Sequence, residues 1–219
     1  MTASDGEAIP AIAPRSAELL RRIAQVALAI SPDVVPEIRV GDTQMLGRLR
    51  EHFGGSLPAT LEAMYAEADP GALTIPFPGE DLDFIPLSDV VDAHIEDGLP
   101  PNFAPFARAS KAVIAVDVQA AKGGPDAEHV EQAPVVVLQP AGGEWDSEVV
   151  AESLDRFLSV LLEILEWMYR SMRAQGTSEG ERSSADISVT VDPEKLVELE
   201  SLLEKVDPDH VDFWMSLVS

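Results

Sequence analysis

Apolar residues recur with helical spacing in several stretches of the chain. The clearest stretch is 154–172, where they form a nearly complete series with a 3.6-residue period. Shorter amphipathic or capped segments predict helices over 14–30, 45–53, 58–68, 89–97, 193–206 and 208–218. The wide apolar stripe of 154–172 needs cover on two sides. We expect a sheet on one side and the N-terminal helix, the C-terminal segment or a second subunit on the other.

Short β-branched or alternating runs predict strands at 73–77, 82–85, 111–118 and 134–139. The last two are expected to form an antiparallel pair inside the sheet, joined by the polar loop 120–131. Asp117 ends the first of them and is expected to accept hydrogen bonds from loop amides. The segment 99–106, with three prolines, is expected to be irregular, and 187–191 could add to an open sheet edge.

These elements predict an α+β fold, with a mixed, mostly antiparallel sheet packed against helices. Four segments follow from the composition along the chain. A lead and first helix occupy 1–40, a central domain 41–173, a Ser/Gly/Glu-rich linker 174–186, and a strand-helix-helix appendage 187–219. Ser88 is the expected N-cap of the helix at 89–97, whose Val90, Val91 and Ile95 should face inward.

The segment 45–87 reads as a helix, a glycine break, Leu57-Pro58 before a second helix, a turn at Asp69-Pro70-Gly71, and a hairpin. This order resembles the Smi1/Knr4 (SUKH) superfamily. The likeness extends more weakly to about Leu165 and departs from the family at 69–71 and 109–111. The matching residues are Gly54, Leu57, Pro58, Tyr65, Gly71, Ile85, Pro86, Leu87, Ser88, Asp89 and Val90.

The formal net charge is -24, and most of the imbalance lies in the middle of the chain. Residues 1–60 hold 6 basic and 7 acidic side chains, residues 61–150 hold 3 and 17, and residues 151–219 hold 6 and 15. Such a field repels nucleic acid and anionic lipid, and it attracts basic protein surfaces. We therefore expect neither a nucleic acid nor a membrane as partner. The alternative is that the acidity serves only solubility.

Candidate chemistry is sparse. The four histidines are far apart in sequence and are expected to be surface or helix-face residues, and neither a phosphate-binding loop nor an H-E-x-x-H motif occurs. Glu80, Asp81 and Asp83 lie in one turn, which is the minimum for a cation site or for paired-carboxylate acid–base catalysis. We expect no metal, no cofactor and no catalysis, with a hydrolase at this cluster as the minor alternative.

The chain has no cysteine, no apolar run of membrane-spanning length and no basic leader, so a cytoplasmic location is expected. The resemblance implies a bacterial immunity protein that neutralises a cognate toxin, often a nuclease. An acidic protein suits a basic toxin domain. The alternative is a regulatory or scaffold protein of the Smi1/Knr4 type, with a homodimer formed through 154–172 or the tail, and Trp214 as the best candidate for a subunit contact. The expected contact residues are the acidic ones of the central loops: Glu80, Asp81, Asp83, Glu96, Asp97, Asp126 and Glu128.

Overall fold

The computed structural model describes residues 15–34, 36–120, 133–174 and 193–218. Its helices are α1 (Ser16–Ile30), α2 (Thr43–His52), α3 (Ala59–Ala68), α4 (Val90–Glu96), α5 (Leu154–Ala174), α6 (Pro193–Val206), η3 (Pro208–His210) and α7 (Val211–Val218). Its strands are β1 (Thr74–Ile75), β2 (Leu82–Phe84), β3 (Phe103–Ala109), β4 (Ala112–Asp117), β5 (Val135–Ala141) and β6 (Glu144–Ala151).

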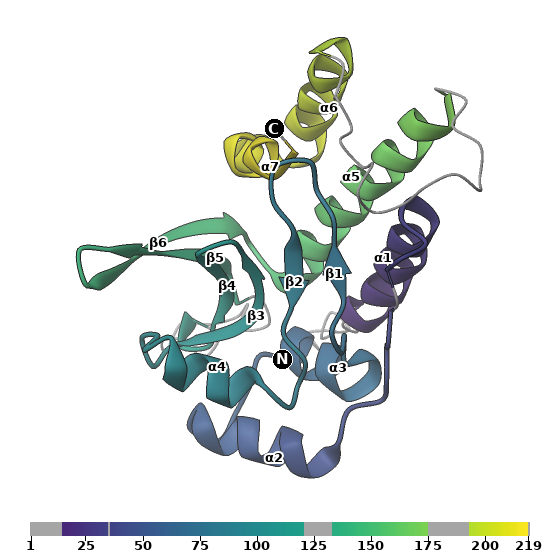
Figure 1. Cartoon of the computed structure of the whole chain (residues 1–219). Coiled ribbons are helices and arrows are strands. Elements are labelled where there is room, and N and C mark those ends of the chain that lie inside the picture. The colour runs from purple at the N-terminus through teal and green to yellow at the C-terminus, as the bar shows by residue number, and fades with distance from the viewer. Residues whose placement is uncertain (1–14, 35, 121–132, 175–192, 219) are drawn as a thin grey trace, which may run out of the picture.

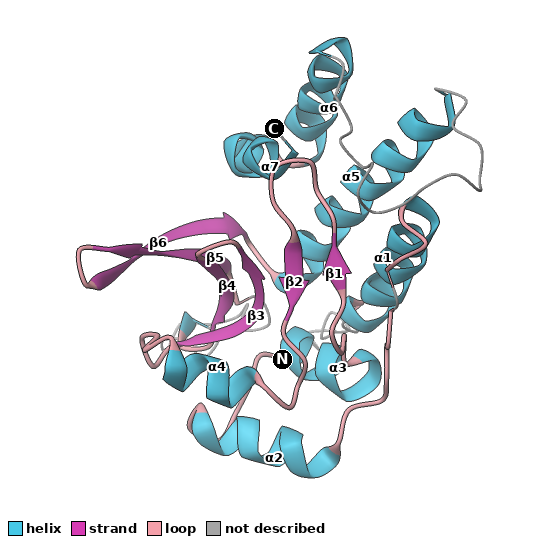
Figure 2. Cartoon of the chain, in the orientation of Figure 1, coloured by secondary structure: helices cyan, strands magenta, loops and turns pink. Residues whose placement is uncertain are grey.

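The six strands form one sheet in sequence order, and each pairs antiparallel with the next (Figures 1 and 2). The predicted α+β class with a mostly antiparallel sheet is therefore confirmed. The predicted pairing of 111–118 with 134–139 is also confirmed, as β4 and β5. The predicted linker 174–186 and the strand 187–191 lie outside the described residues, apart from Ala174, which ends α5.

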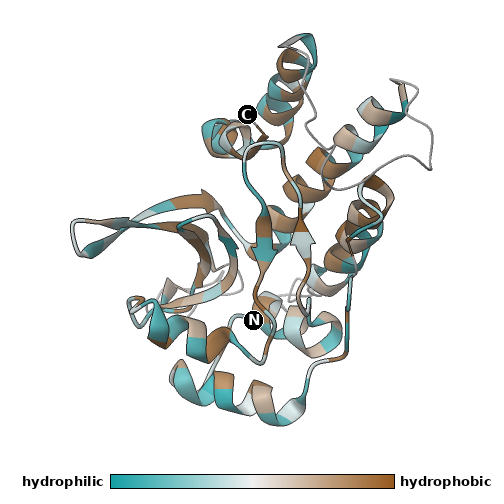
Figure 3. Cartoon of the chain, viewed as in Figure 1, coloured by the Kyte–Doolittle hydropathy of each residue, from teal (hydrophilic) through white to brown (hydrophobic). Residues whose placement is uncertain are grey.

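The main core lies between one face of the sheet and the helices. Phe157, Leu161 and Leu165 of α5 are buried there, and α1, α3 and α6 all contact α5. Figure 3 shows the brown, apolar sides of α5 and α1 turned toward each other. The wide stripe of α5 is thus covered within the chain by both the N-terminal helix and the C-terminal helices.

The C-terminal helices contribute to this same core. Leu199 and Leu203 of α6 and Trp214 of α7 are buried in one cluster with Phe157, and the Trp214 and Phe157 rings lie 4.9 Å apart. The prediction that Trp214 makes a subunit contact is wrong, because this side chain is 0% exposed within the single chain. Its Nε1–H donates to the carboxylate of Asp207 at 2.8 Å.

The prediction of an irregular segment at 99–106 is wrong for its second half, since β3 begins at Phe103. Pro105 lies at a β-bulge, where the register with β4 shifts between Pro105 and Ala107. A bulge tolerates the missing N–H that would otherwise exclude proline from an inner strand. Proline content therefore misled the prediction.

Two local predictions for α4 are also wrong. Ser88 is not the N-cap; Asp89 takes that place without a side-chain capping bond, and the Ser88 hydroxyl donates to the Asp89 carboxylate at 2.6 Å. Ile95 is 61% exposed rather than inward, while Val90 and Ala93 are buried. By contrast, the prediction for Asp117 is confirmed: its Oδ1 accepts from the amides of Gln119 at 2.9 Å and Ala120 at 3.1 Å.

A smaller cluster covers part of the opposite face of the sheet. Leu99, from the loop after α4, packs with Val113, Val136 and Leu138, and Trp145 is partly buried against them. The Trp145 Nε1–H donates to the carbonyl of Gly98 at 3.2 Å, which ties β6 to that loop. This face is only partly covered, and β5 and β6 extend beyond the main core (Figure 1). None of the described helices combines the length and apolar character needed to cross a bilayer.

Candidate binding surface

The sheet half of the chain, by which we mean residues 61–150, carries many acidic side chains and few basic ones. No lysine or arginine occurs between Arg50 and Arg108. The described residues of 61–150 hold fourteen acidic side chains, that is, the seventeen of this block without those at 126, 128 and 131. Their basic counterparts in the same described residues are Arg108 and Lys111. The excess seen in the sequence is therefore placed largely on the strands, their turns and α4.

Three of the predicted contact residues lie on the β1–β2 hairpin. Asp81 is exposed and Glu80 half-buried on the connecting turn, and Asp83 is exposed on β2. The Asp83 carboxylate accepts a hydrogen bond of 2.5 Å from the hydroxyl of Thr74, its cross-strand partner on β1. This bond fixes the direction of a charge that would otherwise rotate freely in solvent.

Two further predicted residues lie at the end of α4. Glu96 is exposed, and Asp97 forms an ion pair of 2.6 Å with Arg108 of β3. Arg108 also lies opposite Asp83 in the strand register. Both side chains of this ion pair are substantially exposed, so it contributes little to stability. It does occupy one of the two cations in the described residues of 61–150, and Glu62 of this block is paired with Arg50 of α2.

The predicted contact residues do not form one cluster. The structure brings Asp83 and Asp97 to either side of Arg108. It places the turn carrying Glu80 and Asp81 at one end of the hairpin and α4, with Glu96, toward the other (Figure 1). Asp126 and Glu128 lie outside the described residues.

Sequence reasoning missed a third acidic group, on β6. Glu144, Asp146 and Glu148 are all exposed. The strands predicted from the sequence do not include this segment. A usable signal was the alternation of acidic with other residues from 144 to 149, because a period of two is the mark of a strand.

A histidine pair was also missed. His52 at the end of α2 and His94 of α4 are 42 residues apart in sequence, yet Nε2 of His52 lies 3.0 Å from Nδ1 of His94. The other ring nitrogen of His94 lies 3.2 Å from the carbonyl of Pro100, so its proton is assigned there. The His52 Nε2–H then donates to His94, and the Phe53 ring packs edge-on against both imidazoles.

Burial lowers the pKa of His94; the nearby His52 lowers it further, while the hydrogen bond to Pro100 opposes the shift. His94 is 9% exposed. The arrangement joins α2 to α4 through the two imidazole rings. His94 is therefore a buried residue on a helix face, which is one of the two positions expected for the histidines.

The structure gives no support to a cation site at 80–83. Within the four described ranges, no three side chains of His, Asp or Glu are grouped so that they could hold a metal ion. Comparison of the sequence with known proteins finds no family model that matches it and no similar curated protein. The resemblance to the Smi1/Knr4 superfamily therefore stays a prediction.

Proposed function

We propose that this chain is a non-catalytic binding protein that engages a basic protein partner through the acidic surface of its sheet half. This acidic sheet surface consists of Glu80, Asp81, Asp83, Glu96 and Asp97. The strand register places Glu144, Asp146 and Glu148 of β6 on the opposite face of the sheet from Asp83. The observation that carries the proposal is the excess of acidic side chains in the described residues of 61–150, fourteen against Arg108 and Lys111. Of these fourteen, Glu62 is paired with Arg50 and Asp97 with Arg108.

A surface whose negative charges are mostly not paired with cations acts mainly on the rate at which a partner protein associates. It raises the association rate of a cationic partner by about 10- to 1,000-fold at low ionic strength, and salt screens the effect. The same field disfavours phosphate backbones and anionic headgroups. A protein with a basic cleft or basic segments is the partner that this charge distribution favours.

The finer proposal is that the partner is a bacterial toxin and that this chain is its immunity protein. A nuclease toxin carries a basic cleft for its substrate, and an acidic protein that covers such a cleft would inhibit it. The resemblance to the Smi1/Knr4 superfamily supports this reading, and the cysteine-free composition supports a cytoplasmic site of action.

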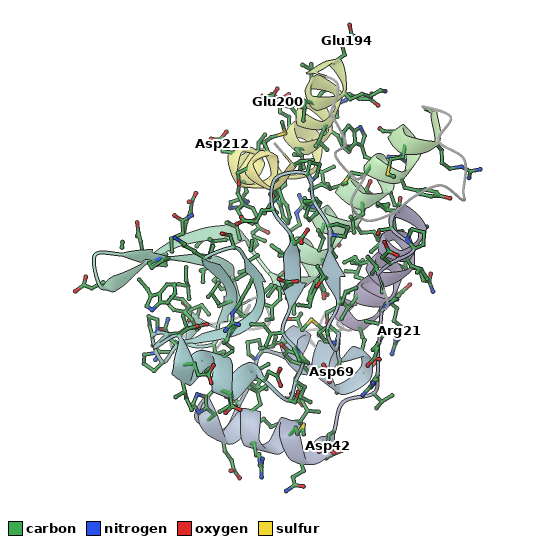
Figure 4. The ribbon with its side chains drawn as sticks, in the orientation of Figure 1. Arg21, Asp42, Asp69, Glu194, Glu200 and Asp212 are labelled. Carbon is green, nitrogen blue, oxygen red and sulfur yellow. The ribbon has the colours of Figure 1, made fainter. Side chains whose placement is uncertain are left out.

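The test is binding to a basic toxin domain encoded beside this chain, measured from low to high salt. We expect the association rate to fall steeply with salt. Reversal of Glu80, Asp81 and Asp83 to lysine should lower it about tenfold or more at low salt. The matched control reverses Glu200, Glu204 and Asp212, which are exposed on α6 and α7 (Figure 4 labels Glu200 and Asp212).

The control removes the same number of negative charges from α6 and α7 and should lower the rate less. Binding that is independent of salt, or that both triple variants weaken equally, would contradict the proposal that the sheet half receives the partner.

A further inference from the structure

Strand β6 forms one edge of the sheet. In the described part of the chain it is the last strand in the order and pairs only with β5 (Figure 2). With eight residues it is much longer than β1, the two-residue strand at the opposite edge. An edge strand offers a row of backbone donors and acceptors to any extended segment that can pair with it.

The register with β5 shows which backbone groups of β6 face outward. Trp145 lies opposite Pro140, and Ser147 lies opposite Leu138. Proline has no N–H, so the Trp145–Pro140 pair cannot exchange both hydrogen bonds and belongs to the non-hydrogen-bonded class. Ser147, two residues on, belongs to the same class, which directs the N–H and C=O of both residues away from β5.

The hydrogen bonds agree with this assignment. The Ser147 N–H donates to the carboxylate of the preceding residue, Asp146, at 3.0 Å. A side chain thus satisfies a donor that a neighbouring strand would otherwise use. An incoming strand would replace this local bond with a backbone carbonyl.

The side chains of β6 alternate in chemistry. Glu144, Asp146 and Glu148 share one face, and Trp145, Ser147 and Val149 share the other. Val149 is 48% exposed, and no lysine or arginine occurs from 142 to 155. A strand added at this edge would therefore meet a row of carboxylates on one face. On the other face it would meet the apolar Trp145 and Val149 with Ser147 between them.

We propose that the β6 edge receives an extended segment of the partner protein, in which lysine or arginine alternates with apolar residues. The basic character of the partner rests on the proposed function; the docking mode and the alternating pattern come from the edge itself. Backbone pairing would supply affinity and the two side-chain rows specificity. A second, unaltered copy is a poor occupant, because pairing β6 with itself brings acidic side chains against acidic side chains.

The probe for this proposal is a copy of the chain that carries E144K, D146K and E148K, which presents a basic edge of the same shape. Wild-type and reversed chains are mixed at 50 mM and 500 mM NaCl and followed by sedimentation velocity and amide hydrogen exchange. The matched control copy carries E200K, E204K and D212K, the same residue types reversed on α6 and α7.

We expect a mixed dimer with the edge variant at low salt, with slowed exchange at Ser147, and none with the control copy. Ser147→Pro in the wild-type chain should abolish the dimer, because it removes an outward donor without removing a bond to β5. If the Ser147→Pro variant does not fold, amide exchange at Ser147 of the wild-type chain, measured in the mixture with the edge variant, still tests the proposal.

Equal association of the wild-type chain with the edge variant and with the control copy would overturn strand addition. Association without slower exchange at Ser147 would overturn it as well. In either case the acidic side chains would act by electrostatic attraction alone. Absence of any mixed dimer would mean that the acidic side chains guard the edge against pairing, which also overturns the inference. None of these results touches the proposed function, which fails only if binding to the basic toxin domain lacks the salt and charge dependence given above.

Discussion

Replacing Trp214 with phenylalanine should destabilise the protein more than the same change at Trp167. Both indoles are almost completely buried, at 0% and 5% exposed. The Trp214 Nε1–H donates to Oδ2 of Asp207, itself 5% exposed, whereas Nε1 of Trp167 meets no hydrogen-bond acceptor in the structure as described. The pair of substitutions thus separates the cost of lost volume from the cost of a lost hydrogen bond.

The magnitudes follow from these contacts. Loss of indole volume costs about 1–2 kcal/mol at either site, a fraction of the cost of complete truncation. Trp214→Phe also removes a hydrogen bond to a buried carboxylate, which adds about 1.5–3 kcal/mol. Trp167→Phe instead removes a buried donor that lacks a partner, which offsets part of the volume term. We expect a difference of about 2–3 kcal/mol between the two variants.

The assay is urea unfolding followed by far-ultraviolet circular dichroism, since both variants lose a fluorescent residue. An equal or smaller loss in Trp214→Phe would refute the reasoning. It would mean that α7 and Asp207 do not belong to the cooperative core, and that the C-terminal helices unfold separately.

The remaining predictions concern the histidine pair and the packing around α3. The pKa of His94 is lowered in the folded state, so below the ordinary histidine pKa of about 6.5 the unfolded chain binds a proton at His94 more readily than the folded protein does. The free energy of unfolding is therefore at its full value above this pH and falls as the pH drops below it. His94→Gln should flatten the dependence of the unfolding free energy on pH between 7 and 5, and an unchanged slope would contradict the assignment. Gly41→Ala should cost about 3 kcal/mol or prevent folding, because a Cβ there would lie 2.0 Å from the carbonyl oxygen of Tyr65; a melting temperature equal to wild type would refute it. Tyr65→Phe should cost about 1–1.5 kcal/mol, since the hydroxyl donates to the Ile85 carbonyl at 3.0 Å in a fully buried site.

The sequence predicted best the features that depend on local pattern. The helix at 154–174 follows from its period, and the place of Asp117 follows from the cost of burying a carboxylate without donors. The proline entries of the last two helices predicted 193–206 and 208–218 closely.

The errors arise where tertiary contacts override local signals. Pro105 enters an inner strand because a bulge accepts it, and Ile95 stays exposed because α4 turns its other side toward the sheet. Strand β6 has only two buried residues, Val150 and Ala151, so its outer part carries no hydrophobic alternation to detect.

Candidate site residues were harder to predict than secondary structure. The acidic excess of the middle block was visible in the sequence, but its division among the hairpin turn, α4 and β6 depends on the sheet order. The His52–His94 contact joins residues 42 positions apart, and no spacing rule in a single sequence points to such a pair.

The central claim is that the acidic sheet surface exists to receive a basic partner. The most direct measurement is the association rate constant with a basic toxin domain encoded beside this chain, determined by stopped-flow mixing from 20 to 500 mM NaCl. If the acidic surface attracts the partner, the association rate constant should fall by about tenfold or more over this range of salt. It should also fall further on reversal of Glu80, Asp81 and Asp83 than on reversal of Glu200, Glu204 and Asp212. A rate that is unaffected by salt and by both reversals would contradict it.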